Sequence, residues 1–404
     1  MTSEWNHFAL GEITELVIDY RGKTPKKLGG DWCKQGYRAL SAKNIKTGRI
    51  VQAETIRYID ESLYRKWMKD EVQRGDILIT SEAPFGQIFF WDSDEKIVLS
   101  QRLFCVRIKP EYNARFIYYY MTTPEFQSEL DGRATGTTVI GLRQPELMKC
   151  IIRCPEIQEQ KMIAAILSSI DAKIIANEKV NDNLMQQAVT IFKSWFVEYS
   201  PFDGIEPKEW ETVNLEKITS LISRGIAPKY SDNSDQIVIN QKCIRNHMID
   251  LSQARTHTPK VINEKWLRFG DLLINSTGDG TLGRAAQVWF QPQNITVDSH
   301  VTVVRPAKEN LIFYIGLWGV LHEREIESLH TGSTGQTELP KERVKALELH
   351  LPDNGTLDRF NTLIAPMAAA IVSKQNENNK LATLRDALLP KLMSGEIDVS
   401  AVQL

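Results

Sequence analysis

The sequence RGDILI at residues 74–79 returns as FGDLLI at residues 269–274, 195 positions further along the chain. In both copies a glycine and an aspartate lead into three apolar residues, a pattern typical of a turn that enters a buried β-strand. Other sequences repeat in the same order: Trp5 opens WNHFALGEI, and Trp210 opens WETVNLEKI. We therefore predict a duplicated unit of about 200 residues, too long for a solenoid repeat.

The repeat continues to the end of each unit. ATGTTVIGLRQPEL begins at Ala134 and HTGSTGQTELPKER begins at His330. Short apolar runs bounded by turn residues predict strands at residues 76–80, 87–91, 103–108, 271–275, 286–290 and 300–305. A helical segment is predicted between residues 112 and 130, whose aromatic residues we expect in the core rather than on a base-stacking surface.

A long stretch with helical periodicity follows each globular part. The first runs without proline from Pro155 to Tyr199. Residues at three- and four-residue spacing predict a heptad seam in each helix, formed by Leu167, Ile170, Ile174, Asn177, Asn181 and Leu184 and by Ile364, Met367, Ile371, Asn378, Leu381 and Leu388. Asn181 and Asn378 occupy matching places, and a polar layer at a seam typically fixes register. Because a globular domain separates the helices in sequence, we predict that they pair antiparallel within the chain.

These patterns predict an α+β fold with two repeated mixed α/β domains, separated by long helices that pair as an antiparallel coiled coil. The expected domains are residues 1–154 and 203–352, and the expected helical segments are residues 155–202 and 353–404. About 40 helical residues span roughly 60 Å, so that the helices could act as a ruler between two domains.

The composition is that of an ordinary soluble protein, with 42% hydrophobic and 25% charged residues. No apolar run reaches the roughly 18 residues of a membrane span, and the first residues lack a signal-peptide core, so we expect a cytoplasmic protein. The five cysteines are scattered, and no second Cys or His pair accompanies Cys150 and Cys154. We therefore expect reduced thiols and no metal site.

The net charge of −2 argues against an indiscriminate nucleic-acid binder. Residues 21–49 nevertheless contain nine basic residues and one acid, Asp31. This density suits phosphate contacts, which position a protein on DNA. A solvated basic face is the alternative interpretation.

The combination of these motifs resembles the specificity (S) subunits of type I restriction–modification enzymes. Each half is entered by a Trp-led, LGEI-like sequence, contains a GDILIT-like sequence, and ends in a TG-rich loop and a proline-led heptad helix. The sequence NNKLATLRDALLPKLMSGEI at residues 378–397 is especially typical of the C-terminal helix of that family. The similarity covers essentially the whole chain.

The resemblance implies a division of labour. Each globular domain would be a target-recognition domain that reads one half of a bipartite site in double-stranded DNA. The helices would set the spacer and dock two modification (M) subunits, which would use S-adenosylmethionine to methylate adenine N6. Where they are encoded, two restriction (R) subunits would add cleavage driven by ATP and Mg²⁺. This chain would itself be non-catalytic, with no cofactor, no metal and no membrane partner.

The two domains differ at one loop, SEAP at residues 81–84 against STGD at residues 276–279, so that an asymmetric target is expected. The repeated Arg-Gly…Pro turn at Arg21 and Arg224 is the first choice for DNA contact, since arginine pairs with guanine and Asn or Gln with adenine. The full set of candidates is Arg21, Lys23, Thr24, Lys26, Lys27, Lys43, Asn44, Arg102, Thr137, Thr138, Arg224, Lys229, Gln241, Lys242, Arg245, Ser299, Thr334 and Gln336. Base contact, phosphate contact and an ordinary surface role remain open for each of them.

Three other patterns point elsewhere. GDGTLG at residues 278–283 matches the dinucleotide-binding motif, but a strand rather than a helix is expected after it. The glycine pairs at P-loop spacing lack the Lys-Ser/Thr that a P-loop needs. His300 stands without an acid or nucleophile pattern and is expected to be structural. The alternative function is that of a coiled-coil scaffold protein that does not bind DNA. A third possible function is that of a nucleotide-modifying enzyme.

Overall fold

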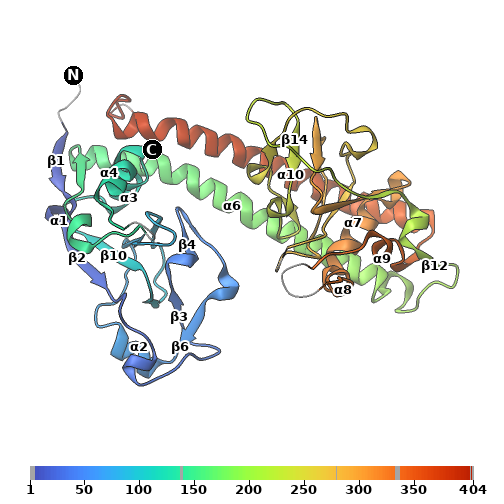
Figure 1. The fold of residues 1–404 in the computed structure, drawn as a ribbon, viewed down its shortest axis with the longest axis horizontal. Coiled ribbons are helices and arrows are strands. Elements are labelled where there is room, and N and C mark those ends of the chain that lie inside the picture. The colour runs from blue at the N-terminus through green and yellow to red at the C-terminus, as the bar shows by residue number, and fades with distance from the viewer. Residues whose placement is uncertain (1–4, 137–139, 279, 333–336, 401, 403–404) are drawn as a thin grey trace. The chain divides into compact units, whose positions relative to one another are not determined.

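The computed structural model describes residues 5–136, 140–278, 280–332, 337–400 and 402. The chain forms two compact units, and in Figure 1 it is coloured continuously from blue at the N-terminus to red at the C-terminus. Unit 1 comprises Met1–Lys173 and Lys380–Leu404, and unit 2 comprises Ile174–Asn379.

Unit 1 contains a four-stranded sheet, a three-stranded sheet and two pairs of short strands, β1 (Asn6–Ala9) with β11 (Ile151–Cys154) and β4 (Ile45–Lys46) with β5 (Arg49–Ile50). Its other strands are β2 (Thr14–Asp19), β3 (Tyr37–Leu40), β6 (Arg57–Ile59), β7 (Ile77–Thr80), β8 (Ile88–Phe90), β9 (Ile97–Leu99) and β10 (Leu103–Ile108). The antiparallel sheet has the order β2-β10-β7-β8, and the second sheet has the order β6-β3-β9, with β3 parallel to β9. The short strands β1 and β11 pair with each other, so the end of the domain returns to its beginning.

Most helices of unit 1 pack on one face of the four-stranded sheet, whereas α2 (Glu61–Trp67) packs in the core shared with the three-stranded sheet. The others are α1 (Leu10–Ile13), α3 (Ala114–Met121), α4 (Pro124–Arg133) and α5 (Gln144–Leu147), joined by the first part of α6 (Ile157–Phe196) and the last part of α10 (Asn354–Met393). Along β7, Ile77 and Ile79 pack with α3 and α4, whereas Leu78 packs in the core shared with the three-stranded sheet. This explains why the strand is apolar at consecutive positions, since both faces of its sheet are covered.

Unit 2 repeats this architecture. Its strands are β12 (Glu211–Asn214), β13 (Thr219–Arg224), β14 (Ile237–Ile239), β15 (Ile244–Arg245), β16 (Met248–Ile249), β17 (Arg255–Thr256), β18 (Leu272–Asn275), β19 (Ala285–Gln287), β20 (Ile295–Val297), β21 (Val301–Pro306) and β22 (Glu348–Leu351), and its short helices are α7 (Ile312–Leu321), α8 (Glu323–Ser328) and α9 (Lys341–Lys345). The sheet orders β13-β21-β18-β19 and β17-β14-β20 match those of unit 1 strand for strand. The predicted α+β fold with two repeated mixed domains is confirmed.

The long helices α6 and α10 pair antiparallel within each unit. In unit 1, Ile163 of α6 shares a core with Leu392 of α10, and further along α6 Asp171 forms an ion pair with Arg385. In unit 2, the side chain of Asn177 donates a hydrogen bond to that of Asn378 at 2.8 Å, and the end of α6 packs its aromatic rings against Phe360. The predicted antiparallel pairing is therefore confirmed.

Most predicted seam positions are buried, although several are only partly so. The buried seam positions are Leu167, Ile170, Ile174, Asn177, Asn181, Ile364 and Ile371, whereas Leu184, Met367, Asn378, Leu381 and Leu388 are partly buried. Among the described residues, no helix combines the length and apolarity that a membrane crossing requires.

The helix predicted over residues 112–130 is in fact two helices, α3 and α4. The break falls at Thr123, whose hydroxyl accepts a hydrogen bond from the backbone N–H of Phe126. Pro124 then occupies the first turn of α4, where its missing N–H costs nothing. The aromatic residues Phe116, Tyr119, Tyr120 and Phe126 are buried, as predicted for a core.

Candidate nucleic-acid interface

The repeated Arg-Gly turns hold the same position in both units, at the end of β2 and of β13. In unit 1, Arg21 donates through Nε and Nη2 to Asp19, both at 2.8 Å, and its guanidinium lies 4.0 Å from the ring centroid of Phe104. Its Nη1 donates to the backbone carbonyl of Leu142 at 3.4 Å. The donors of Arg21 are thus committed within the domain.

Arg224 makes the corresponding contact in unit 2. Its Nη2 donates to the carbonyl of Leu339 at 2.8 Å, and its Nη1 forms an ion pair with Glu338. Leu142 and Leu339 end the loops that close the two domains, each tied by a β-bridge, Thr135 to Gly141 and Thr331 to Glu338. Both arginines therefore support the closing loop, and this role had no counterpart in the sequence prediction. The loop candidates Thr137, Thr138, Thr334 and Gln336 lie outside the described residues.

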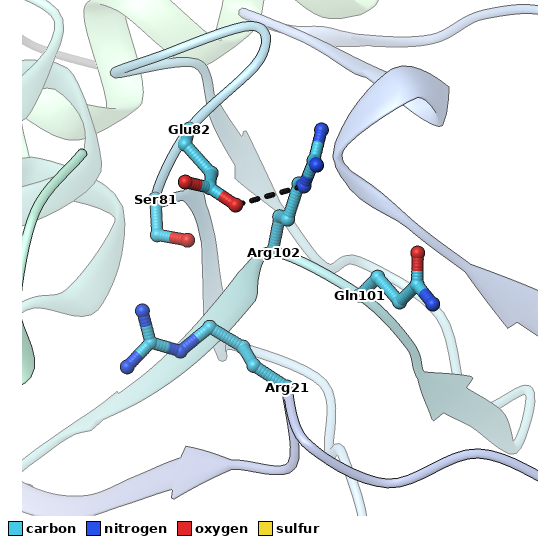
Figure 2. A pocket seen from close by; sticks show the side chains of 5 residues that line it. All are labelled: Arg21, Ser81, Glu82, Gln101 and Arg102. Atoms are coloured by element: carbon cyan, nitrogen blue, oxygen red, sulfur yellow. Dashed lines mark ion pairs between the residues drawn. The ribbon is translucent and has the colours of Figure 1, made fainter. Parts of the chain in front are cut away.

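A pocket beside this support is lined by five residues of unit 1, namely Arg21, Ser81, Glu82, Gln101 and Arg102 (Figure 2). Its frame is backbone: the N–H of Ser81 donates to the carbonyl of Arg102 at 2.9 Å, and the N–H of Leu142 donates to the carbonyl of Ser81 at 3.0 Å. The side chains of Glu82 and Arg102 meet in an ion pair of 2.8 Å from Nε to Oε1. The side chains of Gln101 and Arg102 are exposed.

Unit 2 builds the same frame with different side chains. The N–H of Ser276 donates to the carbonyl of His300, and the N–H of Leu339 donates to the carbonyl of Ser276, both at 2.8 Å. His300 takes the place of Arg102, and its Nδ1 lies 2.7 Å from Oγ1 of Thr277, which takes the place of Glu82. One backbone platform therefore carries an arginine–glutamate pair in one domain and a histidine–threonine pair in the other.

Exposed cations repeat beside the platform. Lys43 and Lys242 are the second residues of two equivalent 3₁₀ turns, Ala42–Asn44 and Gln241–Cys243. In unit 1 the backbone N–H of Ala42 donates to the carbonyl of Gln101 at 3.1 Å, which places the turn against the pocket. Arg245 is likewise exposed, at the end of β15. Cations on a polar surface of this kind can contact phosphates.

Several predicted residues have roles inside the fold. Asn44 is buried, and its amide is hydrogen-bonded to Ser41 and Thr55. The ammonium of Lys23 donates to the carbonyl of Trp67, and burial of this side chain lowers its pKa. These contacts favour a structural role for both residues.

The remaining candidates lie at or near the surface. Lys26, Lys27 and Lys229 are exposed, and Thr24, Gln241 and Ser299 are partly buried. Lys27 donates to the carbonyl of Gly22 at 2.9 Å. His300 is exposed; its backbone N–H donates to Asp298 at 2.9 Å, and its Nδ1 lies 2.7 Å from Oγ1 of Thr277.

No group of three or more His, Cys, Asp or Glu residues in the described part of the chain is arranged to hold a metal ion. The loop at residues 278–283 is followed by strand β19 and not by a helix, as predicted, so it lacks the strand–loop–helix context of a dinucleotide site.

Sequence reasoning missed Glu82 and Thr277 as site residues. The signal was present in the aligned loops SEAP and STGD, whose second residues differ while the serine before them is shared. Their contacts with Arg102 and His300 depend on strands that are about 20 residues away in sequence, so that only the fold reveals them.

Two copies of one α+β domain, each with a polar platform at the ends of its central strands, define a duplicated-domain protein. The chain belongs to the type I restriction modification DNA specificity domain family, whose model matches residues 2–186 and 207–365. The family expected from the repeated motifs and the C-terminal helix is thus confirmed.

Individual relatives agree with this assignment. The chain is similar to the type I restriction enzyme MjaIX specificity subunit of Methanocaldococcus jannaschii, at 27% identity over 350 residues that cover 81% of this chain and 78% of the relative. It is also similar to the HindI specificity subunit of Haemophilus influenzae, at 20% identity over 407 residues, 81% of this chain and 88% of the relative. Among solved structures, the type I restriction–modification S subunit from M. genitalium shares the fold, with a TM-score of 0.58, 14% identity and 96% of both chains covered.

Proposed function

We propose that this chain is the non-catalytic specificity subunit of a type I restriction–modification complex and that each globular domain reads one half of an asymmetric bipartite DNA site. The observation that carries the proposal is the platform common to both units. It keeps its backbone frame but exchanges Arg102 and Glu82 for His300 and Thr277. A shared frame with different exposed donors is what two readers of different half-sites need.

Phosphate contacts would come from the exposed cations beside the platform, Lys43 in unit 1 and Lys242 and Arg245 in unit 2. Such contacts fix register on the duplex but carry little sequence information, so that the platforms would supply the discrimination. Two modest half-site affinities combine through effective concentration when both readers belong to one chain.

The paired helices α6 and α10 would set the number of unspecified bases between the half-sites and dock two M subunits. Methyl transfer from S-adenosylmethionine to adenine N6 would be the work of those subunits. ATP and Mg²⁺ would be required only by R subunits. We place the chain in the cytoplasm, where bacterial and archaeal DNA lies.

The proposal is tested by mapping N6-methyladenine in cells that express a cognate M subunit with this chain or alone. Methylation at one asymmetric bipartite motif, present only with the chain, is expected. An active M subunit that gives the same methylation pattern with and without the chain would contradict DNA reading and favour a scaffold.

A further inference from the structure

The turn that precedes β10 places Arg102 in an unusual backbone conformation. Its φ of 65° lies in the left-handed region, which residues other than glycine rarely occupy. The carbonyl of Arg102 is held at the same time by the N–H of Ser81 at 2.9 Å. Backbone positions that are strained and held in place by their surroundings are concentrated at binding and catalytic sites. The conformation of Arg102 therefore favours a binding role for its side chain.

Glu82 forms an ion pair with that side chain. Oε1 of its carboxylate lies 2.8 Å from Nε of Arg102, and the pair is partly exposed, at 34% of the Glu82 side chain and 48% of the Arg102 side chain (Figure 2). Gly141 of the closing loop lies beside the carboxylate, since a Cβ there would be in ordinary van der Waals contact with Oε2 of Glu82, at 3.4 Å. Among the described residues, the terminal nitrogens Nη1 and Nη2 of Arg102 have no hydrogen-bond partner.

Arg102 therefore differs from the second arginine of the pocket. Arg21 donates hydrogen bonds to the carboxylate of Asp19 and to the backbone carbonyl of Leu142. In Arg102 the two terminal nitrogens form a planar fork without a partner among the described residues, and the carboxylate of Glu82 lies on the Nε side of the guanidinium. A fork of this geometry matches the O6 and N7 acceptors of guanine in the major groove. The carboxylate also offsets the charge of the guanidinium, so that the pair attracts phosphates less than the isolated lysines do.

We propose that Arg102 recognises a guanine in the half-site read by the first domain and that Glu82 is its positioning residue. This inference rests on the proposed function. It is confined to the first domain, because the equivalent platform of the second domain presents His300 and Thr277 and carries no arginine fork.

The test uses the full chain in complex with its M subunit. The methylation map first gives the motif of the wild-type protein, and methylation rates are then measured on duplexes that carry each base pair at each half-site position. Arg102→Gln is expected to lower the preference for one G·C pair by roughly 10- to 100-fold and to leave the other half-site unchanged. Glu82→Gln, which removes the charge but keeps the size, is expected to relax the same position by a smaller factor.

Two further variants separate the alternatives. Arg102→Lys keeps the charge and loses the fork, so that it should relax the same G·C position. The matched control Arg65→Gln removes an arginine of an exposed ion pair with Glu61 in the same domain and should leave every base preference unchanged. The left-handed backbone gives no reason for misfolding of the Arg102 variants, since neither replacement is more strained there than arginine. Thermal unfolding of each variant checks this point.

The outcomes distinguish the two proposals. If the wild-type chain confers no motif, the proposed function fails. If it confers a motif and Arg102→Gln alters no base preference, or lowers methylation equally at all sites, or if Arg102→Lys restores full discrimination, guanine reading by Arg102 is overturned. If Glu82→Gln leaves the position as selective as in the wild type, Glu82 has no positioning role.

Discussion

An ion pair joins the two central strands in each domain, buried in unit 2 and with a partly exposed arginine in unit 1. In unit 2, Arg305 binds Asp271 through Nε and Nη2 at 2.8 and 2.7 Å, with the side chains 7% and 0% exposed. Arg305 also donates to the carbonyls of Glu264 and Trp266. In unit 1, Arg107 and Asp76 repeat the arrangement. The aspartate of the repeated Gly-Asp sequence is therefore structural.

Substitution of this aspartate should destabilise its domain strongly. We expect Asp271→Ala to lower the free energy of unfolding by about 3–5 kcal/mol, because it leaves the Arg305 guanidinium buried without its counter-ion. Urea denaturation measures the change. The control Glu61→Gln breaks an exposed pair with Arg65 and should leave the midpoint unchanged. Equal midpoints for wild type and Asp271→Ala would show that the buried pair does not stabilise the domain.

The buried cysteines should make the stability of the fold depend on pH. Burial raises the pKa of the Cys150 and Cys154 thiols to about 12, and it raises the pKa of Cys105 and Cys243 as well. A raised pKa in the folded state means that these thiols stay protonated while those of the unfolded chain ionise near pH 9. Their contribution to stability is therefore complete below that pH and declines as the pH rises further.

Thiol labelling at pH 8 checks the burial on which this prediction rests, and urea denaturation between pH 8 and pH 10 measures the predicted decline in stability. The partly exposed Cys33 should react first with a thiol-specific disulfide reagent, and the four buried thiols should react only at the rate at which the protein unfolds. Reaction of all five cysteines at one rate in the native protein would contradict the burial that the structure assigns.

At the scale of elements, the seam of α6 contains two asparagines with different surroundings. Asn177 donates to Asn378 at 2.8 Å and to Glu377 at 3.0 Å. Asn181, one helical turn further on, is buried, and its side-chain oxygen has no hydrogen-bond partner among the described residues. A satisfied polar layer fixes register, whereas an unsatisfied acceptor only lowers stability.

Leucine at these two positions should therefore have opposite effects. Asn181→Leu is expected to raise the free energy of unfolding by about 1 kcal/mol, since it removes an unpaired buried acceptor. Asn177→Leu is expected to lower it by about 1–3 kcal/mol, because it removes the donor to the side-chain oxygen of Asn378. Chemical denaturation of the two variants side by side is the measurement, and a change of the same sign in both would show that the two asparagines are equivalent.

The sequence was sufficient to predict the elements with strong local signals. The Gly-Asp turns lead into β7 and β18 as expected, and the heptad spacing predicts α6 and α10. The break between α3 and α4 was missed, although Thr123 and Pro124 together form an N-cap signal. The site was harder to predict, because the role of Arg21 is set by Leu142, 121 residues away, and by Phe104 on a neighbouring strand.

At the scale of the whole molecule, the helices carry the prediction about spacing. An insertion of four residues in α6 near Asn181, with a matching insertion in α10 near Asn378, lengthens each helix by about 6 Å. We expect the preferred spacer between the half-sites to grow by about two base pairs, and the methylation map of the variant measures it. A spacer that stays the same length would contradict the role of the helices as a ruler.

The central claim is that the two domains read two different halves of one DNA site. It is tested most directly by fluorescence anisotropy of the chain–M complex on four duplexes: the mapped motif intact, either half scrambled, and both halves scrambled. We predict that the intact site binds at least roughly 10³-fold more tightly than the fully scrambled duplex at physiological salt, with each half-scrambled duplex in between. Equal affinity for all four duplexes, or an affinity that depends on one half alone, would contradict the account.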